Sequence, residues 1–145
     1  MARASTSRGR GGERETALSA RPSESLSRER RIELYRWMLL TRRLEERLVN
    51  LYRQNQIVGG LYRSLGQEAE TIGAVFALEK QDIVGPLIRN LGAVLVKGYR
   101  PRDVAMQYMA RAGGPTRGKD LNTHFGTVPE PGVVAPVSML GDTVP

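Results

Sequence analysis

The sequence predicts a mostly helical fold with one short strand near its end. Four stretches carry apolar residues at helical spacing or are bounded by the glycines and prolines that delimit helices. Within residues 113–145, which carry many glycines and prolines, residues 133–140 are the only strand-like run. With 145 residues and 40% hydrophobic composition, the chain is long enough for one domain with a core. No apolar run approaches the roughly 20 residues needed to cross a bilayer, so no membrane partner is expected.

The longest predicted helix covers residues 27–54. Apolar residues recur there at three- and four-residue steps and form one stripe that would face the core. Ser27 or Ser25 can cap the first turn, because a serine hydroxyl can accept a hydrogen bond from a free helical N–H group. We expect the helix to end at Asn55, before a pair of glycines. The stripe consists of Leu34, Trp37, Met38, Thr41, Leu44, Leu48, Leu51 and Tyr52.

A second helix is predicted from about Gly66 to Glu79. Its buried residues would be Ala69, Ile72, Gly73 and Phe76. Glycine lowers helix stability, so Gly73 is interpreted as a point of close packing against another element.

Three short elements follow the second helix. Residues 82–86 are expected to be extended. Residues 90–97 are predicted to form a short helix that Gly98 ends. Pro101 suits the first residue of a further helix, which we expect to end near Ala112, before another glycine pair.

Residues 1–25 are predicted to be a disordered basic tail. They contain almost no large apolar side chain, so burial could not offset the entropy lost on ordering. An arginine- and serine-rich N-terminus can also be an organelle transit peptide, which would lead to the mitochondrial matrix. Glu13, Glu15 and Glu24 argue against a transit peptide, so the preferred expectation is the cytoplasm of a bacterium.

The net charge of +7 has two interpretations. All but three of the 22 basic residues are arginine, and such an excess can indicate nucleic-acid binding. The alternative is an arginine-rich composition with helices that pair arginine with glutamate. We prefer the alternative, because residues 42–47 interleave bases with acids and no nucleic-acid motif with an aromatic platform occurs.

The chain has no cysteine and a single histidine, His124. This excludes disulfides, thiolate metal sites and metal sites with several histidines. There is also no dinucleotide or P-loop glycine pattern, no nucleophile elbow and no carboxylate cluster with metal-ligand spacing. Three places remain as candidates for function.

The first candidate is the polar, glycine-containing segment 64–69. It could line a site or a subunit contact. Alternatively, Ser64 and Gly66 form an ordinary turn, and Glu68 is placed to favour the positive end of the following helix.

The other two candidates are Arg89 and His124. Arg89 lies in an apolar run and beside a predicted helix start, where it could bind a phosphate through two nitrogens or instead pair with a carboxylate such as Asp82. His124 lies between glycines in segment 118–126, where it could contact a ligand or instead anchor the loop by a hydrogen bond.

These candidates belong to a longer succession of motifs. In order, they are residues 42–47 (Arg-Arg-Leu-Glu-Glu-Arg), Gly60 to Ser64, Gly66-Gln67-Glu68-Ala69, Asp82 with Ile88-Arg89-Asn90 and Gly92, Lys97-Gly98, Gly118-Lys119 with His124, and Val137-Ser138-Met139-Leu140-Gly141 before Pro145. The succession resembles the alpha subunit of the decarboxylating component of pyruvate-type and branched-chain-type 2-oxo acid dehydrogenase complexes. Acetoin dehydrogenase alpha subunits belong to the same family. The resemblance covers about residues 28–145.

The resemblance implies a fold and an activity. The family's alpha subunit is a doubly wound α/β domain that binds thiamine diphosphate with Mg²⁺, so residues 26–145 would be an incomplete part of that domain, mostly helical in the portion present. Family members are heterotetramers of two alpha and two beta subunits with the cofactor at the alpha–beta interface. They oxidatively decarboxylate a 2-oxo acid and transfer the acyl group to a lipoyl-bearing acyltransferase.

The resemblance also assigns roles to individual residues. Arg89 matches the arginine that contacts the diphosphate. Ser138 and Leu140 match positions that touch the aminopyrimidine end of the cofactor. His124 matches a histidine in a loop near the active site and is expected to be a supporting catalytic residue.

The sequence departs from the family pattern at several positions. Ile88 replaces the tyrosine that usually precedes the arginine, and Asp142 and Thr143 replace a polar pair that supports a potassium-binding loop. The family's metal site is a Gly-Asp-Gly followed by an asparagine, which Gly141-Asp142-Thr143 does not reproduce. We therefore expect the Mg²⁺ ligands beyond the end of this sequence, and a truncated subunit that is inactive alone. The alternative functions are a non-catalytic remnant or a basic nucleic-acid-binding protein.

Overall fold

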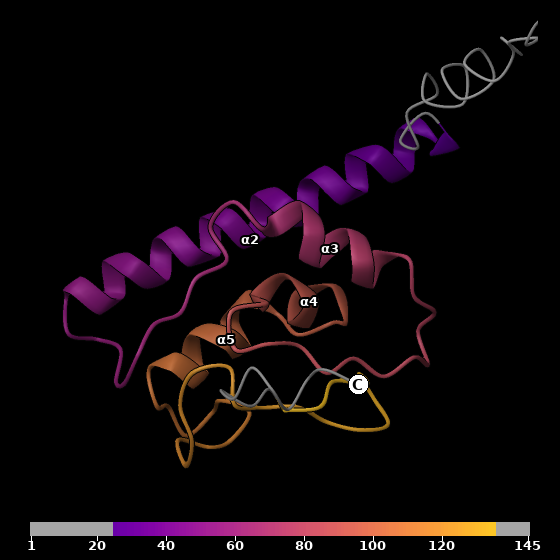
Figure 1. Cartoon of the computed structure of the whole chain (residues 1–145). Coiled ribbons are helices and arrows are strands. Elements are labelled where there is room, and N and C mark those ends of the chain that lie inside the picture. The colour runs from indigo at the N-terminus through magenta and orange to yellow at the C-terminus, as the bar shows by residue number, and fades with distance from the viewer. Residues whose placement is uncertain (1–24, 136–145) are drawn as a thin grey trace, which may run out of the picture. The chain divides into compact units, whose positions relative to one another are not determined.

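A computed structural model of the chain describes residues 25–135 (Figure 1). The chain divides into two compact units, residues 1–33 and residues 34–145. In the first unit the described residues form a turn and the start of helix α2. Ser27 caps this helix, because its hydroxyl accepts a hydrogen bond of 3.3 Å from the N–H group of Arg30. Apart from Ser25, the predicted disordered tail lies outside the described residues.

Helix α2 (Arg28–Arg53) confirms the longest predicted helix to within a residue at each end. Thr41, Leu44 and Leu48 are buried as the stripe predicted, whereas Tyr52 is exposed. The helix ends because Asn55 adopts a left-handed backbone conformation with φ 55°. One further residue on the buried face, Glu45, was not predicted.

Helix α3 (Glu68–Phe76) is shorter than predicted and buries a different face. Its buried residues are Glu68, Thr71, Ile72 and Val75, which recur at helical spacing. Among the residues predicted to be buried, only Ile72 is: Ala69 and Gly73 are exposed and Phe76 is half-buried. The physical reason is that Glu68 turns inward to interact with Arg42 of α2, which fixes the rotation of the helix.

The interpretation of Gly73 as a close-packing glycine was wrong. No atom lies within 4 Å of the position that a Cβ would take there. The glycine that allows close packing against α3 is Gly92, where a Cβ would lie 2.9 Å from Cγ1 of Ile72. This contact lies where α3 packs against helix α4 (Leu91–Val96) (Figure 1).

Helices α4 and α5 confirm the two short helices predicted after residue 90. Residues 91–95 of α4 are all buried, and the chain leaves the helix through Gly98 with φ 116°. Helix α5 (Pro101–Tyr108) begins at the predicted proline. It ends four residues before the predicted end, because Ala110 adopts φ 51° and the N–H group of Arg111 turns back to the carbonyl of Met106.

The described residues contain two isolated β-bridges, and none of them forms a β-strand of several residues. Val84 pairs in parallel with Val133: its N–H group donates to Gly132 and its carbonyl accepts from Val134, at 2.8 and 2.9 Å. Val133 also pairs antiparallel with Thr127. The extended conformation predicted for residues 82–86 is thus confirmed at Val84, and the portion described is mostly helical, as predicted.

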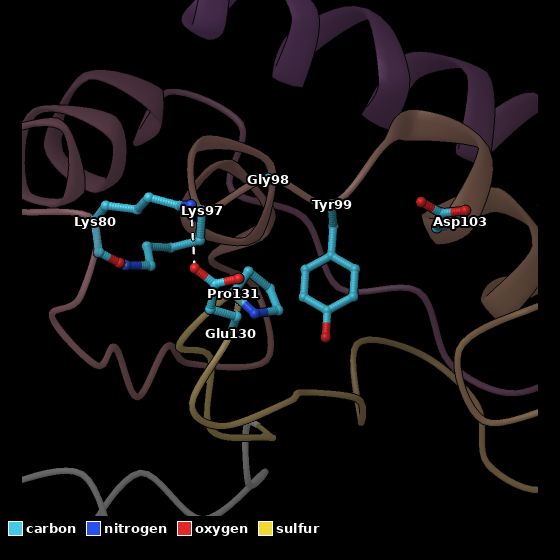
Figure 2. Close-up of a pocket in the computed structure, with 7 residues that line it drawn as sticks. All are labelled: Lys80, Lys97, Gly98, Tyr99, Asp103, Glu130 and Pro131. Carbon is cyan, nitrogen blue, oxygen red and sulfur yellow. Dashed lines mark hydrogen bonds and ion pairs between the residues drawn. The ribbon is translucent and has the colours of Figure 1, made fainter.

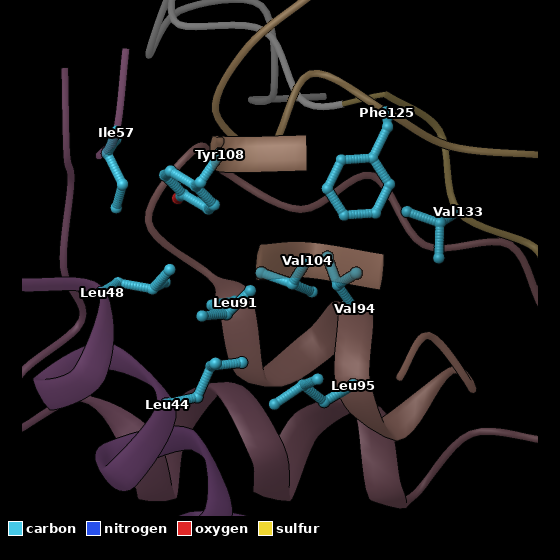
Figure 3. Close-up of a cluster of buried hydrophobic side chains, with 10 residues drawn as sticks. All are labelled: Leu44, Leu48, Ile57, Leu91, Val94, Leu95, Val104, Tyr108, Phe125 and Val133. Atoms are coloured by element: carbon cyan, nitrogen blue, oxygen red, sulfur yellow. The ribbon is translucent and has the colours of Figure 1, made fainter. Parts of the chain in front are cut away.

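One cluster of buried hydrophobic side chains draws on α2, α4, α5 and irregular segments of the chain (Figure 3). Tyr108 of α5 and Leu91 of α4 lie in it with side chains of α2 and of the loop that follows α5. This packing holds the irregular segments against the helices. The cluster consists of Leu44, Leu48, Ile57, Leu91, Val94, Leu95, Val104, Tyr108, Phe125 and Val133.

Candidate functional site

The turn before α3 is anchored to α2 by a buried carboxylate. Glu45 is only 2% exposed, and its Oε1 accepts hydrogen bonds from the N–H group of Ser64 at 2.9 Å and from its hydroxyl at 2.6 Å. The turn itself closes between the carbonyl of Ser64 and the N–H group of Gln67 at 2.7 Å, with Gly66 at φ 88°. The turn predicted for segment 64–69 is therefore confirmed, and Glu45 adds a contact that the segment alone did not indicate.

Glu68 connects the same turn to α2 a second time. Its carboxylate accepts hydrogen bonds from Nε of Arg42 and from the N–H group of Gly66, which is 3.0 Å away. The Arg42 hydrogen bond is the largest cause of the lowered pKa of Glu68; burial opposes it. The segment 64–69 is thus held by two acidic side chains, one before it in the sequence and one within it.

Tyr108 of α5 extends this buried polar region toward the loop that follows α5. Burial raises the pKa of its phenol, nearby Glu45 raises it further, and hydrogen bonding to the Thr123 side chain lowers it. The Tyr108 phenol thus interacts with the Thr123 side chain and lies in the electrostatic field of Glu45, to which it makes no hydrogen bond.

Thr123 continues the connection to the residue before Arg89. Its hydroxyl donates a buried hydrogen bond of 2.8 Å to the carbonyl of Ile88. Together, Ser64, Glu45, Tyr108, Thr123 and the Ile88 carbonyl form what we call the buried polar thread. Its hydrogen bond between Thr123 and Ile88 joins two segments that are 35 residues apart in the sequence.

Arg89 is half-buried and has no carboxylate partner among the described residues. The predicted alternative of an ion pair with Asp82 is wrong. The Asp82 carboxylate instead accepts the N–H group of Glu79 at 2.8 Å. A guanidinium that is partly removed from water without an acidic partner is suited to bind an anionic ligand.

His124 follows Thr123 and has one satisfied ring nitrogen. Its Nδ1 lies 3.3 Å from Oδ1 of Asp120, so the loop-anchoring hydrogen bond that was one of the two interpretations is present. Its Nε2 is buried and has no hydrogen-bond partner in the described part of the chain. An unsatisfied buried nitrogen leaves the second interpretation, contact with a ligand, open.

The structure therefore places the three sequence candidates within or directly beside one group of buried polar residues. Ser64 and the Ile88 carbonyl belong to the thread, and Arg89 and His124 directly follow two of its members. Sequence reasoning missed Glu45, Tyr108 and Thr123. Only Glu45 had a usable signal, since an acid one position after Leu44 lies on the apolar stripe of α2. Ser138 and Leu140 lie outside the described residues.

A cavity of about 350 Å³ lies elsewhere, at the end of α4 (Figure 2). Its charges are balanced. Lys80 pairs with Glu130 at 3.1 Å, and Lys97 donates to the carbonyls of Lys80 and Asp82. The cavity contains none of the candidate residues, and its lysines serve to hold the irregular chain around it. The lining residues are Lys80, Lys97, Gly98, Tyr99, Asp103, Glu130 and Pro131.

Within residues 25–135, metal sites, membrane-spanning helices and the pairing of the arginines were each compared with the structure. No group of three histidine, cysteine, aspartate or glutamate side chains there could hold a metal ion. No helix in this range is long and apolar enough to span a membrane. The arginines of residues 42–43 pair with acids, Arg42 with Glu68 and Arg43 with Glu46, as the composition-based interpretation of the charge predicted.

Comparison with known proteins gives consistent matches. A family model described as "Dehydrogenase E1 component" matches residues 35–141. The 2-oxoisovalerate dehydrogenase subunit alpha of Bacillus subtilis (strain 168) is 37% identical over 103 residues, which are 70% of this chain and 31% of that protein. The pyruvate dehydrogenase E1 component subunit alpha of Rhizobium meliloti (strain 1021) is 37% identical over 99 residues, 68% of this chain and 28% of that protein.

A third relative is similar over a shorter range. The 3-methyl-2-oxobutanoate dehydrogenase subunit alpha of Mycobacterium tuberculosis (strain ATCC 25618 / H37Rv) is 41% identical over 76 residues, 52% of this chain and 20% of that protein. The chain thus spans less than a third of the length of these curated relatives.

Proposed function

The chain belongs to the dehydrogenase E1 component family, and on this premise we propose that it forms part of the alpha subunit of a 2-oxo acid dehydrogenase. The complete enzyme would oxidatively decarboxylate a 2-oxo acid and pass the acyl group to a lipoyl carrier. The relatives support this assignment, because their names describe alpha subunits of pyruvate and branched-chain 2-oxo acid dehydrogenases. Within that enzyme, residues 26–145 would be part of a doubly wound α/β domain.

The cofactor of the proposed reaction is thiamine diphosphate, which when bound supplies the nucleophilic carbon that attacks the 2-oxo group. The observation that carries the proposal is the unpaired, half-buried Arg89 next to the buried polar thread. A diphosphate oxygen would give this guanidinium the anionic partner that it lacks among the described residues. The Arg89 side chain therefore fits a diphosphate group.

His124 has a supporting role in the proposal. Its Nδ1 is held by Asp120, which orients the ring, and its buried Nε2 is left to contact the cofactor or substrate. Ser138 and Leu140 remain proposed contacts for the aminopyrimidine end. No group of three or more histidine, cysteine, aspartate or glutamate side chains within residues 25–135 could hold a metal ion, and the proposal places no Mg²⁺ ligand among these residues.

The proposal includes a beta subunit and the lipoyl-bearing acyltransferase as partners. The support for these partners comes from the family match. Large apolar side chains also remain exposed within residues 34–135, among them Tyr35 on α2, Leu65 in the anchored turn and Ile83 beside the parallel bridge. An assembly of two alpha and two beta subunits would cover such surfaces.

The proposal is tested by calorimetric titration of thiamine diphosphate, with Mg²⁺ in the buffer, into the full chain and its Arg89→Ala variant. Charge-assisted hydrogen bonds contribute about 1.5–3 kcal/mol, so the variant should bind roughly 10- to 150-fold more weakly. Arg102→Ala, which removes an exposed arginine of α5, is the matched control and should bind within about twofold of wild type. Equal affinities of the Arg89→Ala variant and the wild-type chain would overturn the proposed role of Arg89.

A further inference from the structure

We propose that Thr123 is a positioning residue that holds Arg89 and His124 in the arrangement needed to bind thiamine diphosphate. This inference rests on the proposed function, because it takes Arg89 to be a diphosphate-binding residue. The side chain that receives this role carries no charge and is not itself proposed to contact the cofactor.

The first step is the contact between Thr123 and the peptide that precedes Arg89. Thr123 is 1% exposed, and its hydroxyl donates to the carbonyl of Ile88 at 2.8 Å. That carbonyl belongs to the same planar peptide unit as the N–H group of Arg89. The hydrogen bond therefore fixes the orientation of the backbone from which the Arg89 side chain departs.

The second step is that Thr123 is itself held in place. Asn122 before it has a left-handed backbone conformation with φ 58°, and the carbonyl of Thr123 accepts the N–H group of Phe125 at 2.7 Å. The Phe125 ring packs edge-on against Tyr99 with 4.9 Å between ring centroids. The Tyr108 hydroxyl interacts with the Thr123 side chain from α5. A rigid Thr123 can transmit its position to Ile88.

The third step connects the same loop to His124. The His124 ring is held by Asp120, whose carbonyl in turn accepts a hydrogen bond of 3.0 Å from Nε2 of Gln107 on α5. Thr123 and His124 are adjacent in the chain, and α5 contacts the loop at Asp120, before the pair, and at Thr123 itself. A displacement of Thr123 would move the backbone of both proposed ligand-binding residues.

The isosteric change Thr123→Val isolates this role. Valine has the shape of threonine but no hydroxyl, so the buried Ile88 carbonyl loses its donor and the peptide before Arg89 is free to rotate. Thr123→Ser keeps the hydroxyl and removes only a methyl group. A purely structural role would lower stability in the valine variant without changing how well the folded protein binds the cofactor.

The experiment titrates thiamine diphosphate into the full chain as wild type, Thr123→Val, Thr123→Ser and Arg89→Ala, at a temperature where circular dichroism shows each to be folded. We expect Thr123→Val to raise Kd at least fivefold and Thr123→Ser to stay within twofold. If the valine variant does not fold, Thr123→Cys takes its place, since a thiol is a weak donor of similar size, and it should raise Kd at least threefold.

The outcomes separate this inference from the proposed function. If Arg89→Ala weakens binding but the valine or cysteine variant binds within twofold of wild type, the positioning role of Thr123 is overturned. If Arg89→Ala itself binds like wild type, the proposed function of Arg89 fails and the inference fails with it.

Discussion

Replacing Glu45 with alanine should remove the anchor that connects α2 to the turn before α3. The Glu45 carboxylate is buried, and one of its oxygens accepts both hydrogen bonds that Ser64 can donate. Because Ser64 is also buried, water cannot replace the lost acceptor without opening the structure. We therefore expect the variant to be substantially destabilised.

The loss of stability in Glu45→Ala can be estimated from the two Ser64 donors that would be left without an acceptor. Each buried donor of Ser64 without a partner costs about 1–3 kcal/mol. Removal of the carboxylate also removes its own desolvation cost, which is appreciable because Oε2 of Glu45 has no partner among the described residues. The net loss in the free energy of unfolding should be about 2–4 kcal/mol. Glu45→Gln, which keeps an acceptor oxygen, should lose less than about 1.5 kcal/mol.

Urea denaturation at pH 7, followed by circular dichroism, measures these differences. Glu46→Ala is the matched control, since Glu46 is the next residue on α2 and makes only an exposed ion pair with Arg43. The control should change stability by less than about 1 kcal/mol. If Glu45→Ala destabilises no more than the Glu46 control does, Ser64 is not anchored by Glu45 and the buried polar thread is incorrectly placed.

Three other substitutions test the packing and the ion pair. Gly126→Ala should lower the thermal midpoint by an amount equivalent to about 1–3 kcal/mol or more, because the new Cβ would lie within 3 Å of backbone atoms of residues 133–135. Gly73→Ala should raise stability by about 0.5–1 kcal/mol in the same thermal scan, since the site is open and helical; a loss there would contradict the described rotation of α3. Glu68 has a folded-state pKa below its ordinary value of 4.5, so its pairing with Arg42 stabilises the fold above that pH and is lost as pH falls through the lower pKa. Urea midpoints between pH 6 and 3 should therefore fall less steeply for Glu68→Gln, and an unchanged slope would refute the pairing.

Local signals in the sequence were sufficient for most element boundaries. The stripe of α2 predicted its extent, and Gly98 and Pro101 bound α4 and α5 because their effects depend only on their own backbone conformations. The end of α5 was not predictable in this way. Ala110 has no intrinsic preference for the left-handed conformation that it adopts, so surrounding contacts determine it.

Contacts between residues far apart in the sequence explain why the buried face of α3 was predicted wrongly. Its apolar residues permit more than one buried face, and the face is selected by Glu68, an acid that a sequence pattern places on the surface. The partner that makes its burial favourable, Arg42, lies 26 residues earlier. No local pattern could indicate this pairing.

The candidate site residues could be chosen from their residue types, but the contacts that link them to other segments could not be predicted. Arg89 and His124 were identified because a cation in an apolar run and a histidine in a glycine-rich loop are unusual. Tyr108 and Thr123 are ordinary residues of a helix and a loop, and their importance depends on one hydroxyl reaching the Ile88 carbonyl from 35 residues away. Such a contact exists only once the fold is formed.

The most direct test of the account follows the side-chain Nε–Hε resonance of Arg89 by nuclear magnetic resonance, assigned by comparison with Arg89→Ala. Thiamine diphosphate, with Mg²⁺ present, should shift this resonance progressively until it saturates, and inorganic diphosphate should shift it in the same direction. Thiamine without phosphate should leave it unchanged, because the guanidinium is expected to recognise the anionic group. A resonance that does not move with either diphosphate, or that moves equally with thiamine, would contradict the assignment of Arg89 to the cofactor's diphosphate.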